Sequence, residues 1–94
     1  MAIKKIMCCC GSGIGSSLML RMNVEKVLKQ MGKTGIEVTH STTSDAQAGA
    51  ADLFCVGADL EDFVSSKGEY IALKNIMSAV ELRAALEAKF EKLG

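Results

Sequence analysis

A glycine-rich segment that begins at a cysteine is the part of this 94-residue chain whose residue types are best suited to chemistry. The segment reads Cys10, Gly11, Ser12, Gly13, Ile14, Gly15, Ser16 and Ser17. Its glycines allow a tight turn whose successive N–H groups can form a nest for an anion. A helix that starts here adds its positive end, and the serine hydroxyls can cap that helix or donate to phosphate oxygens. We therefore expect residues 11–17 to bind a phosphate group.

Cys10 is the predicted catalytic residue, because the same nest favours the thiolate form of a cysteine. A thiolate that faces a phosphate-sized pocket can accept a phosphoryl group as a nucleophile. Cys8 and Cys9 lie within the preceding apolar run, where successive side chains point to opposite faces of a strand, and we expect both to be core residues. Cys55 lies in another apolar run and has the same expected role.

Other uses of the loop stay open on the residues alone. Such a turn can serve packing only, or it can bind a nucleotide, although it lacks the GxGxxG spacing and the lysine of a Walker A loop. Low-molecular-weight tyrosine phosphatases have an arginine six positions after the catalytic cysteine, where this chain has Ser16, and the nearest arginine is Arg21. They also use an Asp-Pro acid, and this chain has no proline. Hydrolysis is therefore disfavoured, and a phosphocysteine that persists until another acceptor arrives is favoured.

A metal site is the other common use of clustered cysteines. Three consecutive cysteines lack the Cys-x2-Cys spacing of structural zinc sites. We expect no metal and no other cofactor, and a thiol redox or metal-binding module stays a less favoured alternative.

Strand-like and helical patterns alternate along the chain. Strands are predicted at residues 3–10, 36–40, 52–57 and 70–73, the second with a wetter face and the third buried on both faces. A helix is predicted at 16–31, with an apolar stripe and a stop at Gly32, and another at the C-terminus after a Ser78–Glu81 capping box. Shorter helices are predicted at 44–50 and 60–65.

This order predicts an α/β fold of three layers: a four-stranded parallel sheet with helices on both faces, Rossmann-like or flavodoxin-like, with a phosphate loop after the first strand. One domain spanning residues 1–94 is expected from the length. Ligands of such folds bind at the carboxyl ends of the strands, which directs attention to Cys10 and to residues 40–42, 57–59 and 74–75.

The charge balance excludes several classes of protein. The chain has 11 basic and 11 acidic residues and no net charge, which argues against nucleic-acid binding and against a polybasic membrane anchor. Its longest apolar run is far shorter than a membrane-spanning helix, so no direct membrane insertion is expected. The N-terminus does not resemble a signal peptide, which favours a cytoplasmic location with free thiols.

The segment from Cys10 to Ser17 and the Met- and Leu-rich run up to Glu25 resemble the IIB components of the bacterial phosphoenolpyruvate-dependent sugar phosphotransferase system, and the L-ascorbate type above all. Galactitol and lactose/cellobiose types share the phosphocysteine plan, but their loops look different. The resemblance implies that a phosphohistidine on a IIA partner donates to Cys10. It also implies that the phosphocysteine passes its phosphoryl group to a sugar held by the membrane component IIC. A IIB for another sugar, such as galactitol, and a cysteine-based phosphatase or reductase are the alternatives.

Residues outside the loop have less certain roles. His40 is predicted to be a solvated strand-end residue, with phosphate binding or assistance in transfer as the alternative. The carboxylates Asp59, Glu61 and Asp62 would repel a phosphothiol and are expected at a rim or at a partner contact. Met19 and Met22 are either core residues or a pliable docking surface for two partners.

Overall fold

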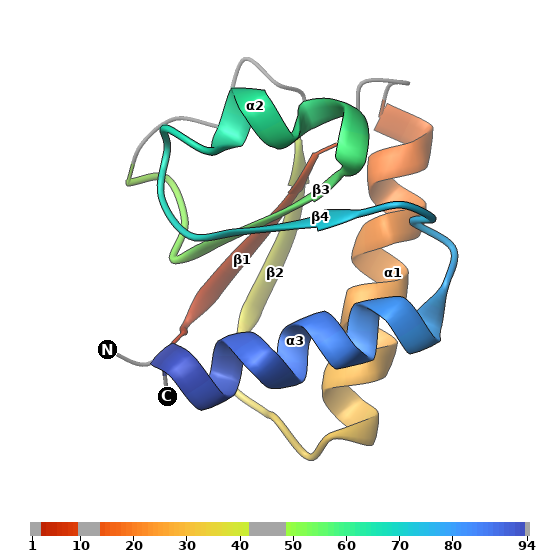
Figure 1. Ribbon diagram of the computed structural model, residues 1–94. Coiled ribbons are helices and arrows are strands. Elements are labelled where there is room, and N and C mark those ends of the chain that lie inside the picture. The colour runs from red at the N-terminus through yellow and green to blue at the C-terminus, as the bar shows by residue number, and fades with distance from the viewer. Residues whose placement is uncertain (1–2, 10–13, 42–48, 94) are drawn as a thin grey trace.

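The computed structural model describes residues 3–9, 14–41 and 49–93, and within them the chain forms a four-stranded parallel sheet (Figure 1). The strands are β1 (Lys5–Cys9), β2 (Glu37–Ser41), β3 (Leu53–Gly57) and β4 (Tyr70–Leu73). Their order across the sheet is β2-β1-β3-β4, so β1 and β3 are central. This is the strand order of flavodoxin-like folds, in which the chain reverses direction next to β1 and leaves a crevice at the carboxyl ends.

The burial of the strands follows their sequence patterns. Every residue of β3 is buried, as its unbroken apolar run predicts. β2 alternates in sequence and lies at one edge, where its residues are exposed or half-buried. The prediction of a strand with a wetter face is confirmed.

Helices cover both faces of the sheet. The long helices α1 (Ile14–Gln30) and α3 (Ala79–Leu93) lie together on one face, and the 3-10 turn η2 (Ala58–Leu60) and the short helix α2 (Glu61–Val64) lie on the other (Figure 1). The predicted three-layer α/β architecture is therefore confirmed.

Two apolar clusters lie on either side of the sheet because strand side chains alternate. The larger cluster, on the α1 and α3 side, includes Ile6 and Cys8 of β1, and the smaller one, on the α2 side, includes Met7 and Cys9. Cys8 and Cys9 thus point to opposite layers, as their neighbouring positions predict.

The end of α1 shows why Gly32 stops the helix. Gly32 has a φ of 72°, in the left-handed region that glycine adopts without strain. Its N–H donates to the carbonyl of Lys29 at 3.1 Å, and the N–H of Lys33 donates to the carbonyl of Leu28 at 2.9 Å. These bonds form a Schellman motif, which satisfies carbonyls that the helix end would otherwise leave unpaired.

The start of α3 differs from the predicted capping box in one half. The Ser78 hydroxyl accepts a hydrogen bond from the N–H of Glu81 at 3.2 Å, as predicted. The Glu81 carboxylate does not return to the N–H of Ser78; it accepts hydrogen bonds from the N–H groups of Lys74 at 2.9 Å and Asn75 at 3.0 Å. The side chain therefore fixes the loop after β4 rather than the helix terminus.

Two predictions of local structure fall partly on residues that the structure leaves undescribed. Most of the predicted helix at 44–50, and residues 10–13 of the predicted phosphate site at 10–17, lie outside the described residues. The predicted helix at 60–65 is present as α2, and that at 16–31 begins two residues earlier, at Ile14.

Candidate functional site

The predicted nucleophile directly follows the carboxyl end of β1. Cys9 is the last residue of this strand and is paired with Ser41 of β2 and Val56 of β3. Helix α1 begins at Ile14, so four residues join the strand to the helix. These four, Cys10, Gly11, Ser12 and Gly13, lie outside the described residues.

The rest of the predicted phosphate loop forms the first turn of α1. Ile14, Gly15, Ser16 and Ser17 all belong to this helix. Gly15 is exposed, and a Cβ added there would meet no other atom within 4 Å. Ser17 is the one buried polar residue in the described part of the chain. The loop residues therefore stand at a helix N-terminus, which is a favourable place for an anion.

The thiols of Cys8 and Cys55 face each other in the middle of the sheet. The two residues are partners in the register of β1 and β3, and both side chains are fully buried. A hydrogen bond to Cys55 raises the pKa of the Cys8 thiol well above its usual range, and burial raises it further. Cys8 is therefore a protonated core thiol and a poor nucleophile. Its role as a core residue, and that of Cys55, agree with the sequence prediction.

A basic pair lies where β2 meets α1. The Nη1 of Arg21 lies 3.1 Å from the Nδ1 of His40, and the Nε of Arg21 lies 3.4 Å from the Oε1 of Glu25 one turn along the helix. His40 is half-buried and stands opposite Cys8 in the register of β1 and β2. His40 is thus held by an arginine rather than solvated as predicted.

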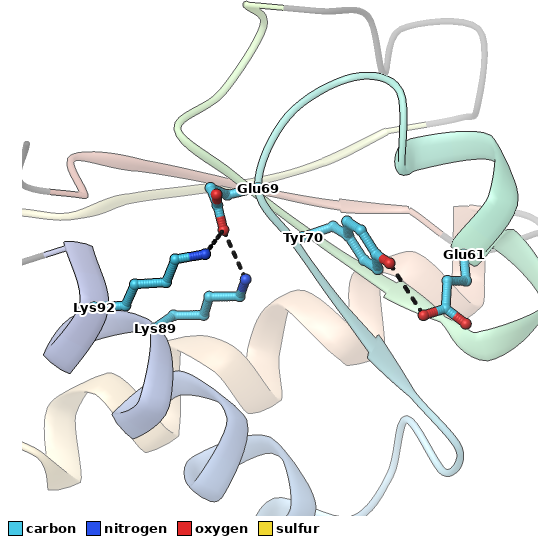
Figure 2. A network of polar contacts seen from close by, with 5 residues as sticks. All are labelled: Glu61, Glu69, Tyr70, Lys89 and Lys92. Carbon is cyan, nitrogen blue, oxygen red and sulfur yellow. Dashed lines mark hydrogen bonds and ion pairs between the residues drawn. The ribbon is translucent and has the colours of Figure 1, made fainter.

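The carboxyl end of β3 leads into acidic residues. A Cβ added at Gly57, the last residue of β3, would come within 2.7 Å of the Asp59 carboxylate, so this side chain folds back over the strand end. Glu61 at the start of α2 accepts a hydrogen bond from the hydroxyl of Tyr70 at 3.2 Å (Figure 2). That hydrogen bond to a carboxylate raises the pKa of Tyr70. The role of these carboxylates at a rim or at a partner contact stays a prediction.

The loop after β4 is tied to α1. The Nδ2 of Asn23 donates to the carbonyl of Ile76 at 3.2 Å, which joins α1 to this loop. The Asn75 side chain accepts a hydrogen bond from the N–H of Met77 at 3.0 Å. Together with the two bonds to Glu81, these contacts join the loop to α1 and α3.

Apolar side chains are exposed on the N-terminal half of α1. Met19 is 47% exposed and Met22 is 59% exposed. The alternative that these methionines are ordinary core residues is therefore wrong, and their role as a docking surface stays a prediction. Met77, on the loop bound to α1, is 51% exposed as well.

The comparisons with known proteins agree with this arrangement. A family model described as the lactose/cellobiose-specific IIB subunit of the PTS system matches residues 5–88. The chain belongs to this family of IIB subunits. The IIB chain is also 27% identical over 84 residues to the "Ascorbate-specific PTS system EIIB component" of Mycoplasma pneumoniae (strain ATCC 29342 / M129 / Subtype 1), a match that covers 86% of this chain and 88% of that protein.

These matches confirm the resemblance to IIB components of the ascorbate type. IIB components are phosphotransferase proteins of sugar transport, and they work with IIA and IIC partners. The family name and the name of the relative refer to different sugars, so they agree on the kind of component and do not fix its substrate. Among the described residues of this IIB chain, no helix is both long and apolar enough to cross a membrane.

The contact between Arg21 and His40 is the feature of this edge that the sequence prediction missed. The two residues are 19 positions apart, and their meeting depends on how β2 is aligned with β1. The apolar stripe of α1 could have indicated this contact. Arg21 directly follows the buried Leu20, so it lies on a flank of the helix and can reach a neighbouring strand.

Proposed function

We propose that this IIB chain is a phosphocarrier that accepts a phosphoryl group on Cys10 from a IIA phosphohistidine and passes it to a sugar bound by the membrane component IIC. The sugar is L-ascorbate, in keeping with the named specificity of the Mycoplasma pneumoniae relative. The chain acts as one domain in the cytoplasm, and residues 11–17 hold the phosphoryl group.

Two displacements at phosphorus make up the relay. In the first, the Cys10 thiolate attacks phosphorus, the S–P bond forms, the P–N bond breaks, and the imidazole of IIA leaves and takes up a proton. In the second, a sugar hydroxyl oxygen attacks phosphorus, the O–P bond forms, and the thiolate leaves. The hydroxyl proton passes to solvent or to a base of the membrane component. Backbone N–H groups aimed at the phosphoryl oxygens lower the barrier of both steps.

The burial of the other cysteines is the observation that carries the proposal. Cys8, Cys9 and Cys55 have no exposed surface, and their places in the two apolar clusters explain why. A phosphoryl group on any of them would put a charged group into the core without a partner, which is costly. In a family of phosphotransferases, this leaves Cys10 as the cysteine that can serve as acceptor.

Transfer of labelled phosphate tests the proposal. The purified chain is incubated with radiolabelled phosphoenolpyruvate, the general phosphotransferase proteins and a IIA partner of ascorbate type. The wild-type protein is expected to take up one equivalent of acid-labile label, and Cys10→Ser is expected to take up none. Cys8→Ala and Cys9→Ala, matched controls from the same strand, are expected to keep it. Label on Cys10→Ser would show that another residue is the acceptor.

Two further measurements separate the alternatives. Rapid hydrolysis of p-nitrophenyl phosphate by the isolated chain would favour a phosphatase. Membrane vesicles that contain IIC are then supplied with the phosphorylated chain and with L-ascorbate or galactitol. Loss of label from the chain with ascorbate alone supports the proposed sugar, and loss with galactitol alone contradicts it.

A further inference from the structure

The edge strand β2 turns backbone groups away from the sheet. The N–H of Glu37 donates to the carbonyl of Lys4 at 2.9 Å, so the backbone groups of Glu37 point toward β1. Successive residues of a strand point their backbone groups to opposite edges. Those of Thr39 therefore also face β1, and those of Val38 and His40 face away from it. Because β1 is the one neighbour of β2 among the described strands, these outward groups are offered to a further strand.

The opposite edge of the sheet, at β4, is less suited to pairing with another strand. The carbonyl of Glu69 accepts a hydrogen bond from β3 at 3.0 Å, so the backbone groups of Tyr70 and Ala72 face outward. β4 is one residue shorter than β2, and the charged residues Glu69 and Lys74 stand directly before and after it. Short length and charged side chains are how natural edge strands avoid pairing. β2 contains no lysine, arginine or proline, so it has less of this protection.

Two buried polar atoms without a hydrogen bond lie beside this same edge. In the described part of the chain they are the Oγ1 of Thr39, the middle residue of β2, and the Nε of Arg21, whose Nη1 contacts His40 at 3.1 Å. The ion pair of Arg21 with Glu25 is long, at 3.4 Å. A buried polar atom that lacks a partner costs free energy, and native structures contain few of them. Their location at one strand edge indicates that a partner outside the chain completes the bonding there.

We propose that two copies of this chain pair through β2, in antiparallel orientation, about a two-fold axis that passes beside Thr39. The axis stands perpendicular to the sheet, so the two sheets become one continuous sheet with α1 of both copies on the same face. The carboxyl ends of the two sheets then point in opposite directions, and neither copy covers the strand ends of the other. This inference goes beyond the proposed function and does not rest on it.

The axis at Thr39 uses the outward backbone groups of both copies. It places Val38 of each copy opposite His40 of the other, and residues so paired in an antiparallel ladder exchange both of their N–H···O bonds. The two Thr39 residues form the pair between them, which has no backbone bonds and brings side chains closest. Threonine hydroxyls bond to each other across strands at this spacing. The second copy thus supplies the partner that the Oγ1 of Thr39 lacks within the chain.

Charges on the flank of α1 favour this axis over its neighbours. Arg21 lies beside His40, and Glu25 lines a shallow groove together with Val38. Because His40 of one copy is opposite Val38 of the other, Arg21 comes opposite Glu25 of the second copy. Both side chains are partly exposed and open to this contact. An axis moved by one residue would instead bring two Arg21 side chains, or two Glu25 side chains, toward each other, and like charges across an interface are unfavourable.

Sedimentation velocity and amide hydrogen exchange of the wild-type chain give the first test. As the concentration rises from micromolar to millimolar, we expect the sedimenting species to change from one chain to two. Over the same range, exchange of the Val38 and His40 amides is expected to slow by about tenfold or more, because pairing protects them. The amides of Tyr70 and Ala72, which face outward at the other edge, are the matched control and are expected to keep their rates.

Three results of these measurements would overturn the proposal. The first is a chain that stays monomeric at every concentration. The second is association that protects Tyr70 and Ala72 in place of Val38 and His40, since it would assign the interface to β4. The third is protection of Val38 and His40 only after a IIA partner is added, which would assign the edge to a strand of another protein.

Charge reversal on α1 gives the second test, which addresses the axis. Arg21→Glu and Glu25→Arg each place like charges across the axis, so each variant alone is expected to dimerise at least about tenfold more weakly. An equal mixture of the two restores opposite charges between copies and is expected to associate about as well as the wild type. Arg83→Glu and Glu87→Arg have the same spacing on α3, which packs toward β4, and are expected to leave dimerisation unchanged.

A mixture that associates no better than its two components would overturn the axis at Thr39. Equal weakening by the α3 variants would do the same, because it would show a general effect of charge. Circular dichroism checks that each variant is folded, and the exchange measurement on the wild type does not depend on how the variants fold.

Discussion

The two ends of the parallel sheet use their polar groups differently. At the amino end, the Asp52 carboxylate accepts hydrogen bonds from the N–H groups of Lys4 at 2.8 Å and Lys5 at 3.0 Å. Glu69, just before β4, binds Lys89 at 2.7 Å and lies 3.5 Å from Lys92 (Figure 2). Each of these carboxylates thus has two partners within the fold.

Toward the carboxyl end, the Glu81 carboxylate also has two N–H partners, but the region between β2 and α1 is less completely bonded. In the part of the chain that the structure describes, two buried side-chain atoms lack a hydrogen bond: the Nε of Arg21 and the Oγ1 of Thr39, the middle residue of β2. Ligands of parallel α/β sheets bind at the carboxyl end, whereas the amino end has only to hold the fold together. The comparison therefore indicates that unpaired buried polar atoms gather beside β2, whereas the two carboxylates at the amino end each have two partners.

Replacing Asp52 with alanine tests the amino end most strongly. The change removes the acceptor shared by two N–H groups at the start of β1, so we expect the free energy of unfolding to fall by about 1–2 kcal/mol. Urea unfolding followed by circular dichroism measures this loss. The rate of phosphoryl uptake by the folded variant is expected to equal that of the wild type, because the change lies at the end away from Cys10. A large loss of rate at full folding would contradict the division between the two ends.

Much of the fold follows from local patterns in the sequence. The four strands, the two long helices and the layers that Cys8 and Cys9 face come from alternation and helical spacing, which depend on near neighbours in the chain. The helix stop at Gly32 was predictable for the same reason, because only glycine adopts its backbone conformation without strain.

The rest of the site depends on contacts between distant segments. The pairing of Arg21 with His40 requires the β1–β2 register, which the crossover through α1 sets and no local pattern contains. Glu81 shows the same limit: its spacing from Ser78 predicts a capping box, yet two loop N–H groups after β4 compete successfully for its carboxylate. The loop from Cys10 was identified by residue type, and its geometry stays a prediction.

Glu81→Gln is expected to have an intermediate effect on stability, at the carboxyl end but outside the phosphate loop. The amide keeps one oxygen as acceptor and loses the charge. In the folded protein, hydrogen bonds from the N–H groups of Lys74 and Asn75 lower the pKa of Glu81. Its contribution is therefore complete above the pKa of an unfolded glutamate, near pH ~4.3, and is lost as the pH falls through the lower folded value. The wild type should thus lose stability on acidification in that range, and Glu81→Gln should lose less.

Urea midpoints between pH 3 and pH 6 measure this difference, with Glu87→Gln as the control. Glu87 is also on α3 and pairs with Arg83 in solvent, without any N–H partner in the β4 loop. Equal pH dependence of the wild type and Glu81→Gln would show that the carboxylate contributes nothing to the loop. Because Asn23 still joins this loop to α1, the rate of phosphoryl uptake is expected to change little.

Glu69→Gln is expected to have the smallest effect, although Glu69 has the shortest ion pair at the amino end. The hydrogen bond from Lys89 is the main cause that lowers the pKa of Glu69, so its contribution too is present above the unfolded pKa and is lost as the pH falls below it. The carboxylate is solvated, and salt screens such pairs. Raising the salt concentration should therefore bring the wild type and Glu69→Gln to the same urea midpoint at pH 7.

Lys92→Gln should shift the midpoint less than Lys89→Gln, because Lys92 is more exposed and lies further from Glu69. A difference in urea midpoint that persists at high salt would mean that desolvated charges hold the amino end. The amino end would then differ from the half-buried Arg21 only in the geometry of the contacts.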